Sequence, residues 1–163
     1  MEAAIGADGR DAPSGAFAAL FSGLNEPFLD PPPPGGPTGF EWLSRDHDEV
    51  ARYVADPWCG FPFSNGLVLD MEEGLQRVWA PGADGSVPRG LPILIFSGDE
   101  DPAGGFGVGV HALAARYRAA GLDVTERLYP GARHELFNET NRDEVERDLV
   151  AWLDRVVPTT STA

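Results

Sequence analysis

The stretch LPILIFSGDED, residues 91–101, decides the fold class of this 163-residue chain. It opens with a nearly continuous apolar run, which is typical of a strand buried on both faces of a parallel sheet, and it ends in a sharp polar turn. A helix with apolar residues at i, i+3, i+4 and i+7 follows from Val110, and Gly121 is a suitable stop for it. Residues 124–129 predict a second strand, so the pattern indicates an α/β fold with a right-handed βαβ unit.

The rest of the chain is expected to be helical or irregular. A last helix should begin near Asn141, where Glu144 completes a capping-box pattern, and Asp143 should pair with Arg147 one turn later. Residues 1–90 are rich in proline and glycine and contain no convincing strand. The features predicted there are short helices at 16–24, 48–55 and 68–79, the second capped by Asp46 and Glu49, and an extended proline loop at 31–37.

The bulk composition excludes several classes of partner. A net charge of −14 argues against nucleic acid and against anionic membrane surfaces, because both require clustered basic residues. No apolar run approaches the ~18 residues that span a bilayer, so stable membrane insertion is not expected. The single cysteine, Cys59, leaves no internal disulfide. The first residues have no signal-peptide pattern, so we expect a cytoplasmic location; the oligomeric state has no signature in the sequence.

Two polar residues follow the predicted strands at the edge where parallel strands deliver functional groups. Asp101 follows the first strand, and His134 follows the second, 33 residues later. A carboxylate beside a histidine fixes the imidazole tautomer and stabilises the imidazolium, which makes the histidine a general base. Taken singly, Asp101 fits a turn aspartate and His134 a solvated histidine. Their joint position in successive strand-to-helix loops favours catalysis.

The local sequences around these residues resemble those of a known family of α/β-hydrolases. The family is the lysophospholipase and monoacylglycerol-lipase-like group, also called the serine aminopeptidase S33 group. The resemblance extends over nearly all of residues 1–157. It is carried by residues 92–105 for the acid loop, residues 129–135 followed by Asn138 and Glu139 for the histidine loop, and segments 42–46 and 56–61 for parts of a bacterial lid.

The resemblance implies a hydrolase that acts on a small-molecule lipid or ester. It implies Asp101, rather than Asp99, as the catalytic acid and His134 as the catalytic base. Members of the family also carry a Gly-x-Ser-x-Gly elbow with the nucleophilic serine. None of the serines of this chain lies in such a motif; they are Ser14, Ser22, Ser44, Ser64, Ser86, Ser97 and Ser161.

We therefore expect a partial α/β-hydrolase fold, in which lid helices precede a terminal βαβα unit. Residues 1–90 would form a lid or cap-like region, residues 91–157 the C-terminal part of the hydrolase core, and residues 158–163 a disordered tail. Such a chain would be inactive alone. Two alternatives stay open: a non-catalytic remnant of a hydrolase, or part of a hydrolase of the same fold with an aspartate nucleophile.

Rival signals for a cofactor, a metal or another nucleophile are weak. The glycines at 104–109 fail the dinucleotide-binding spacing because Val110 stands where glycine is required, so no cofactor is expected. Cys59 fits a packed thiol better than a substitute nucleophile. The acidic turn of Asp99, Glu100 and Asp101 fits a solvated turn better than a metal site.

Other residues have no distinctive functional signal. His47, at a predicted helix start, and His111, within a predicted helix, are interpreted as ordinary surface histidines. The aromatic residues of the lid-like segments suit either an acyl pocket or core packing; they are Trp42, Trp58 and Phe61.

Overall fold

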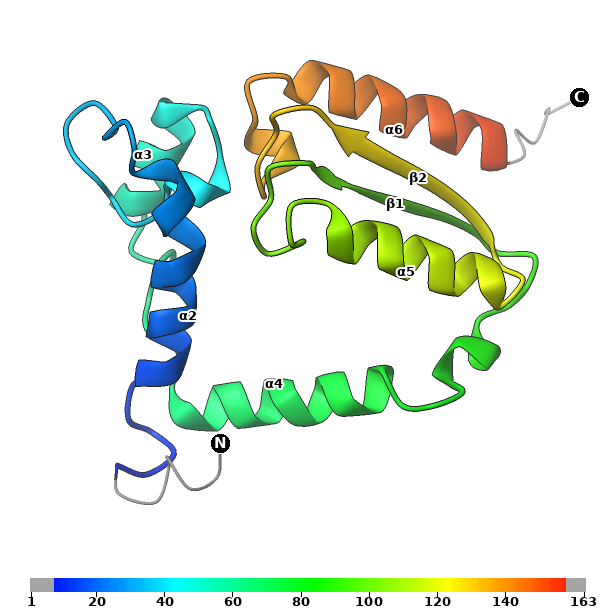
Figure 1. Cartoon of the computed structure of the whole chain (residues 1–163), viewed down its shortest axis with the longest axis horizontal. Coiled ribbons are helices and arrows are strands. Elements are labelled where there is room, and N and C mark those ends of the chain that lie inside the picture. The colour runs from blue at the N-terminus through cyan, green and yellow to red at the C-terminus, as the bar shows by residue number, and fades with distance from the viewer. Residues whose placement is uncertain (1–7, 158–163) are drawn as a thin grey trace, which may run out of the picture.

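The computed structural model describes residues 8–157, and it contains the predicted βαβα unit. Strands β1 (Pro92–Gly98) and β2 (Asp123–Tyr129) pair in parallel, and the register places Pro92 opposite Asp123 and Gly98 opposite Tyr129. Helix α5 (Val108–Ala119) connects the strands, and α6 (Arg142–Val156) follows β2. The carboxyl ends of both strands therefore lie at one edge, beside the loops that precede α5 and α6 (Figure 1).

Successive residues of β2 point to opposite faces of the sheet, as in any strand. On one face, Thr125 accepts a hydrogen bond from the indole N–H of Trp152 on α6. On the other face, Glu126 pairs with Arg118 of α5 at 2.7 Å. Helices α5 and α6 therefore cover opposite faces of the two-stranded sheet, in agreement with Figure 1.

A small buried cluster holds the carboxyl ends of the strands together. It joins the end of β1, the end of β2, the loop after it and α6, through Phe96, Tyr129, Ala132, Leu136 and Val145. Ala132 and Val145 are fully buried. Since the cluster lies directly under the loop that carries His134, packing of apolar side chains fixes the position of that loop.

The described part of residues 1–90 is helical and irregular, as the composition predicts. Its elements are α2 (Gly15–Asn25), α3 (His47–Ala55), α4 (Asn65–Val78) and short 3₁₀ turns at Glu26–Phe28, Glu41–Leu43 and Ala83–Ser86. The fourth such turn, Leu136–Asn138, lies in the loop after β2. Helix α4 begins three residues before the predicted start, because the Ser64 hydroxyl accepts the N–H of Leu67 and caps the helix there.

Two local predictions about α6 are wrong. Asn141 stands at the N-cap, but its side chain makes no capping bond, because its amide oxygen accepts from Arg45. Within residues 8–157 no ion pair joins Asp143 to Arg147. Two other carboxylates of the helix, Glu144 and Asp148, pair with Arg127 of β2 instead. The ion pairs observed for α6 therefore connect it to a neighbouring element rather than join successive turns of the helix.

Within the described residues, β1 has β2 as its sheet neighbour and no second one. The apolar residues 93–96 are consequently only half-buried, although the sequence suits burial on both faces. No helix of residues 8–157 combines the length and apolarity required to cross a bilayer. The predicted tail, residues 158–163, lies outside the described residues.

Candidate active site

The loops after the two strands bring Asp101 and His134 together. The Oδ2 atom of Asp101 lies 3.0 Å from the Nδ1 atom of His134, within hydrogen-bonding distance. Asp99 points elsewhere: its Oδ1 atom accepts the N–H of Gly131 at 2.6 Å. The predicted contact is therefore confirmed, and it involves the second aspartate of the turn rather than the first.

The close approach of these loops depends on a glycine. Gly98, the last residue of β1, lies so close to the histidine loop that a Cβ there would be 1.9 Å from the carbonyl oxygen of Ala132. Backbone bonds tie the two loops at the same place, from Asp99 N–H to the carbonyl of Tyr129 and from Glu100 N–H to that of Ala132. The absence of a side chain at position 98 thus lets the acid loop lie against the histidine loop.

Burial and hydrogen bonding set the charges of the pair. Burial alone would raise the pKa of Asp101, but the hydrogen bond and charge of His134, with the N–H groups of Ala103 and Gly104, outweigh it and lower that pKa. The hydrogen bond to Asp101 raises the pKa of His134 against the effect of burial, and the charges of Asp101 and Glu135 add to the increase. The arrangement favours an ionised carboxylate and stabilises an imidazolium.

A segment from the first half of the chain lies against His134. The Trp42 ring centroid is 4.8 Å from that of the imidazole, and the Trp42 carbonyl accepts the N–H of His134. One residue on, Leu43 accepts the N–H of Glu135 at 2.8 Å. Trp42 and Leu43 are both buried. The Nε2 atom of His134 has no hydrogen-bond partner within residues 8–157, and the side chain is 41% exposed.

Glu139 is a buried residue for which the sequence analysis assigned no role. Its carboxylate accepts the backbone N–H of Arg133, directly before His134, and both the N–H and Nε of Arg45. The only sequence signal for it is its place in the resemblance, where it follows Asn138. A fully buried glutamate outside a helix or strand follows no periodic pattern of apolar residues, so its burial cannot be predicted from the sequence pattern.

The sequence pattern of the serine aminopeptidase S33 family matches residues 11–141, and this span includes the lid-like segments, Asp101 and His134. The chain belongs to this family. It is also 32% identical, over 119 residues, to a monoacylglycerol lipase from Mycolicibacterium smegmatis (strain ATCC 700084 / mc(2)155), a match that covers 68% of this chain and 38% of the lipase.

Solved structures agree with the S33 assignment. A lipase in an open form is similar with a TM-score of 0.72 and 34% identity, over 94% of this chain and 49% of the lipase. A thermostable carboxyl esterase from Bacillus coagulans, in complex with glycerol, is similar with a TM-score of 0.79 and 26% identity, over 91% of this chain and 48% of the esterase. The S33 chain thus spans about half the length, or less, of these relatives.

An aromatic cleft of about 700 Å³ lies in the first half of this S33 chain, and neither Asp101 nor His134 lines it. Two of the predicted pocket residues, Trp58 and Phe61, line it, while Trp42 belongs to the core. Phe21 also lines the cleft, and its ring centroid is 5.5 Å from that of Trp42, which in turn contacts His134. A continuous set of aromatic rings therefore leads from the cleft to the imidazole.

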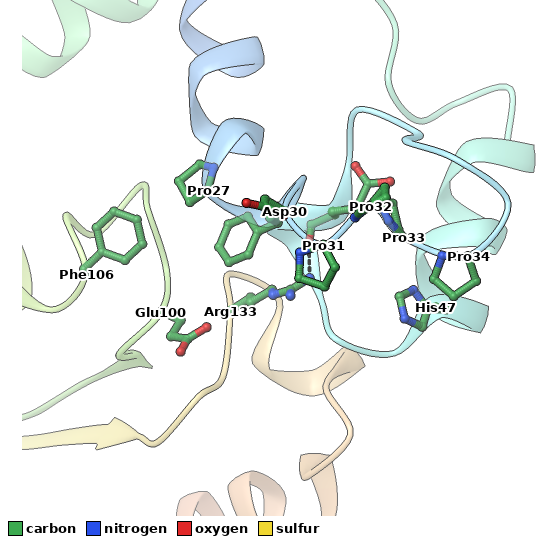
Figure 2. A pocket seen from close by; sticks show the side chains of 12 residues that line it. Pro27, Asp30, Pro31, Pro32, Pro33, Pro34, His47, Glu100, Phe106 and Arg133 are labelled. Carbon is green, nitrogen blue, oxygen red and sulfur yellow. Dashed lines mark hydrogen bonds between the residues drawn. The ribbon is translucent and has the colours of Figure 1, made fainter.

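A second cleft, of about 500 Å³, lies next to the loops that carry Asp101 and His134 (Figure 2). Glu100 and Arg133, the chain neighbours of the pair, line it together with the prolines at 31–34, whereas Asp101 and His134 do not. The Arg133 guanidinium stacks over the ring of Phe28 at 4.1 Å. This cleft has the larger share of charged residues, and, like the aromatic cleft, it is not lined by Asp101 or His134.

The rival residues of this S33 chain lie apart from the pair. The side chain of Cys59 lines the aromatic cleft, and partial burial, with the charges of Asp56 and Glu135, raises the pKa of its thiol, which disfavours a thiolate nucleophile. His111 pairs with Glu126 on the surface of α5. His47 opens α3, as the sequence predicts, and its side chain is exposed.

Proposed function

We propose that this chain is the acid- and histidine-bearing part of an α/β-hydrolase that cleaves carboxylic esters. Asp101 and His134 would be the acid and base of a Ser-Asp-His triad. The observation that carries the proposal is the 3.0 Å contact between Asp101 Oδ2 and His134 Nδ1, made by loops at the carboxyl ends of adjacent parallel strands.

The geometry suits the two residues to distinct roles. Asp101 bonds the Nδ1 atom, so it would hold the ring in the tautomer that leaves Nε2 free to accept a proton. His134 would take the proton of a serine hydroxyl through Nε2 and later return it to the leaving alcohol. Asp101 would stabilise the imidazolium between these steps. No serine of residues 8–157 is hydrogen-bonded to His134, so the nucleophile would come from outside the described residues.

The aromatic cleft supports an ester with an apolar acyl group, such as a monoacylglycerol or a lysophospholipid. Binding sites for apolar ligands are lined mostly by hydrophobic and aromatic side chains, with few polar groups. Exposed apolar side chains of the cleft, Trp58 and Phe61, would be covered by the acyl chain. We also propose that residues 1–90 act as the lid or cap and residues 91–157 as the C-terminal part of the core.

Two other functions share part of this support. The absence of a Gly-x-Ser-x-Gly motif from the 163 residues favours a non-catalytic hydrolase remnant. A hydrolase with an aspartate nucleophile would use the same acid and histidine. Coding DNA upstream of Met1 separates the three: an in-frame Gly-x-Ser-x-Gly supports the serine hydrolase, Gly-x-Asp the aspartate enzyme, and stop codons the remnant.

A chimera tests the roles of the pair directly. In the mycobacterial monoacylglycerol lipase relative, the part that corresponds to residues 11–141 is replaced by these residues, which include Asp101 and His134, and hydrolysis of a p-nitrophenyl ester is measured. We expect turnover, and we expect His134→Ala to lower it by about 10⁶-fold and Asp101→Asn by about 10⁴-fold, as in serine proteases.

The matched control is His111→Ala, which removes an exposed histidine on α5 and should leave turnover unchanged. A folded chimera in which His134→Ala and His111→Ala have equal activity contradicts the assigned role. A chimera that does not fold is replaced by one made in the same way with the Bacillus coagulans esterase, with the same three variants.

A further inference from the structure

The most deeply buried charge near the site is the carboxylate of Glu139, which is fully buried. One oxygen, Oε1, accepts the N–H groups of Arg133 at 2.9 Å and Arg45 at 3.1 Å. The other, Oε2, accepts Nε of Arg45 at 2.8 Å and the N–H of Thr140 at 2.9 Å. A buried carboxylate with this number of donors is held in one orientation, because any rotation would break charged hydrogen bonds.

These bonds join two segments that are far apart in sequence. Arg133 belongs to the loop that carries His134, and Arg45 belongs to residues 41–46, which we call the strap. A second bond between them runs from the Ser44 hydroxyl to the carbonyl of Asn138 at 2.7 Å. A third runs from Nη1 of Arg133 to the carbonyl of Glu41 at 2.6 Å, and Figure 2 shows Arg133 at this junction. Two backbone bonds, from the N–H groups of His134 and Glu135 to the carbonyls of Trp42 and Leu43, also join the segments, and the Glu139 carboxylate accepts a backbone N–H from each of them.

The strap is also the element that packs on the imidazole. Trp42 contacts the ring of His134, and its carbonyl accepts the His134 N–H. On its other side, the imidazole is held by Asp101. The orientation of His134 therefore depends on the strap and the histidine loop keeping their relative position, and Glu139 binds the strap at Arg45 and the loop at Arg133.

The charge of Glu139 is stabilised in this place. Burial would raise its pKa, but the N–H groups of Arg133, Arg45 and Thr140 and the Arg45 guanidinium outweigh burial and lower it. An ionised carboxylate is an acceptor at both oxygens, whereas a neutral amide has one acceptor oxygen and would turn an N–H donor toward a donor. Glu139→Gln thus changes the hydrogen bonding with almost no change in size.

We propose that Glu139 is a positioning residue that locks the strap onto the histidine loop and thereby sets the orientation of His134 toward Asp101. The inference deepens the proposed function, since it takes His134 as the base, but the contacts on which it rests exist without any substrate. It acts through Arg133 and Trp42, and not by touching the imidazole.

The first test measures the pKa of the His134 imidazole by NMR titration of the 163-residue chain. In the wild type, Asp101 and Glu135 raise this pKa. In Glu139→Gln we expect it to fall toward the ordinary value of about 6.5, because the imidazole loses its alignment with Asp101. The matched control is Glu146→Gln, which removes one exposed carboxylate from α6. It should leave the pKa of His134 unchanged.

The second test measures amide hydrogen exchange of residues 41–46 and 130–136 in the same proteins. In Glu139→Gln we expect exchange in both segments to rise by about tenfold or more, since loss of a charged hydrogen bond shifts a local opening equilibrium by that order. Arg45→Gln, which removes the partner of Oε2, should give the same pattern more weakly. Glu146→Gln should exchange like the wild type.

The outcomes separate this inference from the proposed function. A Glu139→Gln protein with a lower melting temperature but an unchanged pKa of His134 would assign Glu139 a purely structural role and overturn the inference. Equal amide exchange of residues 41–46 and 130–136 in wild type and Glu139→Gln would also overturn the inference. This outcome can be read even if poor folding prevents the NMR titration of His134. An inactive chimera contradicts the proposed function alone, because neither test here uses a substrate.

Discussion

At the scale of single residues, the acid turn shows how two similar aspartates receive different tasks. Asp99 and Asp101 are separated by Glu100, so each meets the histidine loop at a different point. Asp99 binds the N–H of Gly131 and ties the two loops together, while Asp101 reaches the imidazole of His134. The first bond is structural support for the second, since it fixes the backbone from which His134 projects.

The first residue-scale prediction concerns the charge of His134. Asp101→Asn removes the carboxylate that stabilises the imidazolium, so we expect the pKa of His134 to fall. A histidine whose pKa is raised on folding stabilises the folded state at any pH below its pKa in the unfolded chain, about 6.5. This stabilisation is lost as the pH rises through its pKa in the folded state. Wild type and Asp101→Asn should therefore differ more in unfolding free energy at pH 5.5 than at pH 9.

The measurements are an NMR titration and urea unfolding at these two pH values. Asp123→Asn, at the opposite end of the sheet, is the control and should not alter the titration of His134. A pKa of His134 that is identical in wild type and Asp101→Asn would contradict the electrostatic argument.

The second residue-scale prediction concerns acid stability. Glu41 is buried, and although burial would raise its pKa, bonds from Thr38 and Asn25 lower it from 4.5 to about 2. A carboxylate whose pKa is lowered on folding stabilises the folded state at any pH above its pKa in the unfolded chain. This stabilisation is lost as the pH falls through its pKa in the folded state. The difference between these two pKa values corresponds to about 3 kcal/mol of unfolding free energy, which is lost between about pH 4.5 and pH 2.

Urea unfolding at pH 7 and pH 2.5 checks this prediction. Glu41→Gln should lose about 3 kcal/mol at pH 7 and much less at pH 2.5. Glu73→Gln, an exposed carboxylate on α4, should lose little at either pH. A Glu41→Gln effect of equal size at both pH values would show that the carboxylate charge is not the cause.

At the scale of elements, the end of β1 decides whether the site can form. The strand must stop at Gly98 so that the acid loop can pass under the histidine loop, where Ala132 leaves no room for a side chain. Helix α4 has no such constraint, because a Cβ at Gly74 would meet nothing within 4 Å. A side chain is therefore excluded at Gly98 but has free space at Gly74.

Substitution by alanine tests this contrast. Gly98→Ala should destabilise the fold by about 3 kcal/mol or more, because the Cβ overlaps the Ala132 carbonyl and forces the backbones apart. Gly74→Ala should stabilise α4 by about 0.5–1 kcal/mol, since glycine is costly within a helix. Chemical denaturation of both variants gives the two values, and a tolerated Gly98→Ala would contradict the described loop packing.

For the whole molecule, the two-stranded sheet is smaller than the apolar sequence of β1 predicts, since such a strand usually has a neighbour on each side. Residues 93–96 are apolar on both faces but only half-buried, and β1 has a free edge in the described structure. Helix α4 lies across from α5 in Figure 1 and exposes an apolar stripe formed by Leu67, Met71, Leu75 and Val78. Such faces and edges favour association with further protein.

We expect the 163-residue chain alone to be marginally stable, to associate as its concentration rises, and to hydrolyse esters no faster than its His134→Ala variant. The physical reasons are the free edge of β1 and, among residues 8–157, the lack of a hydroxyl that is hydrogen-bonded to the imidazole. Analytical ultracentrifugation, thermal unfolding and a p-nitrophenyl ester assay test the three statements. Turnover well above the His134→Ala background, from a monomer that unfolds sharply, would reveal a nucleophile and a closed core within this chain.

Local sequence signals predict the βαβα order and place an acidic turn and His134 at one edge of the sheet, and the family resemblance selects Asp101 within that turn. An apolar run of strand length, a helical stripe and a chain order of acid before histidine are local signals, and parallel pairing follows from the crossover helix. The α-helices of residues 8–90 could also be predicted from the sequence, apart from the earlier start of α4, because capping residues and prolines act on their neighbours in the chain.

Only the tertiary structure decided what surrounds the histidine. Glu139 and Arg45 meet across 94 residues, and Trp42 reaches His134 from the same distant segment. The ion pairs of Glu144 and Asp148 with Arg127 also join elements that are not adjacent in sequence. Periodicity and capping describe neighbours along the chain, whereas a buried carboxylate is stabilised by donors that only folding brings together.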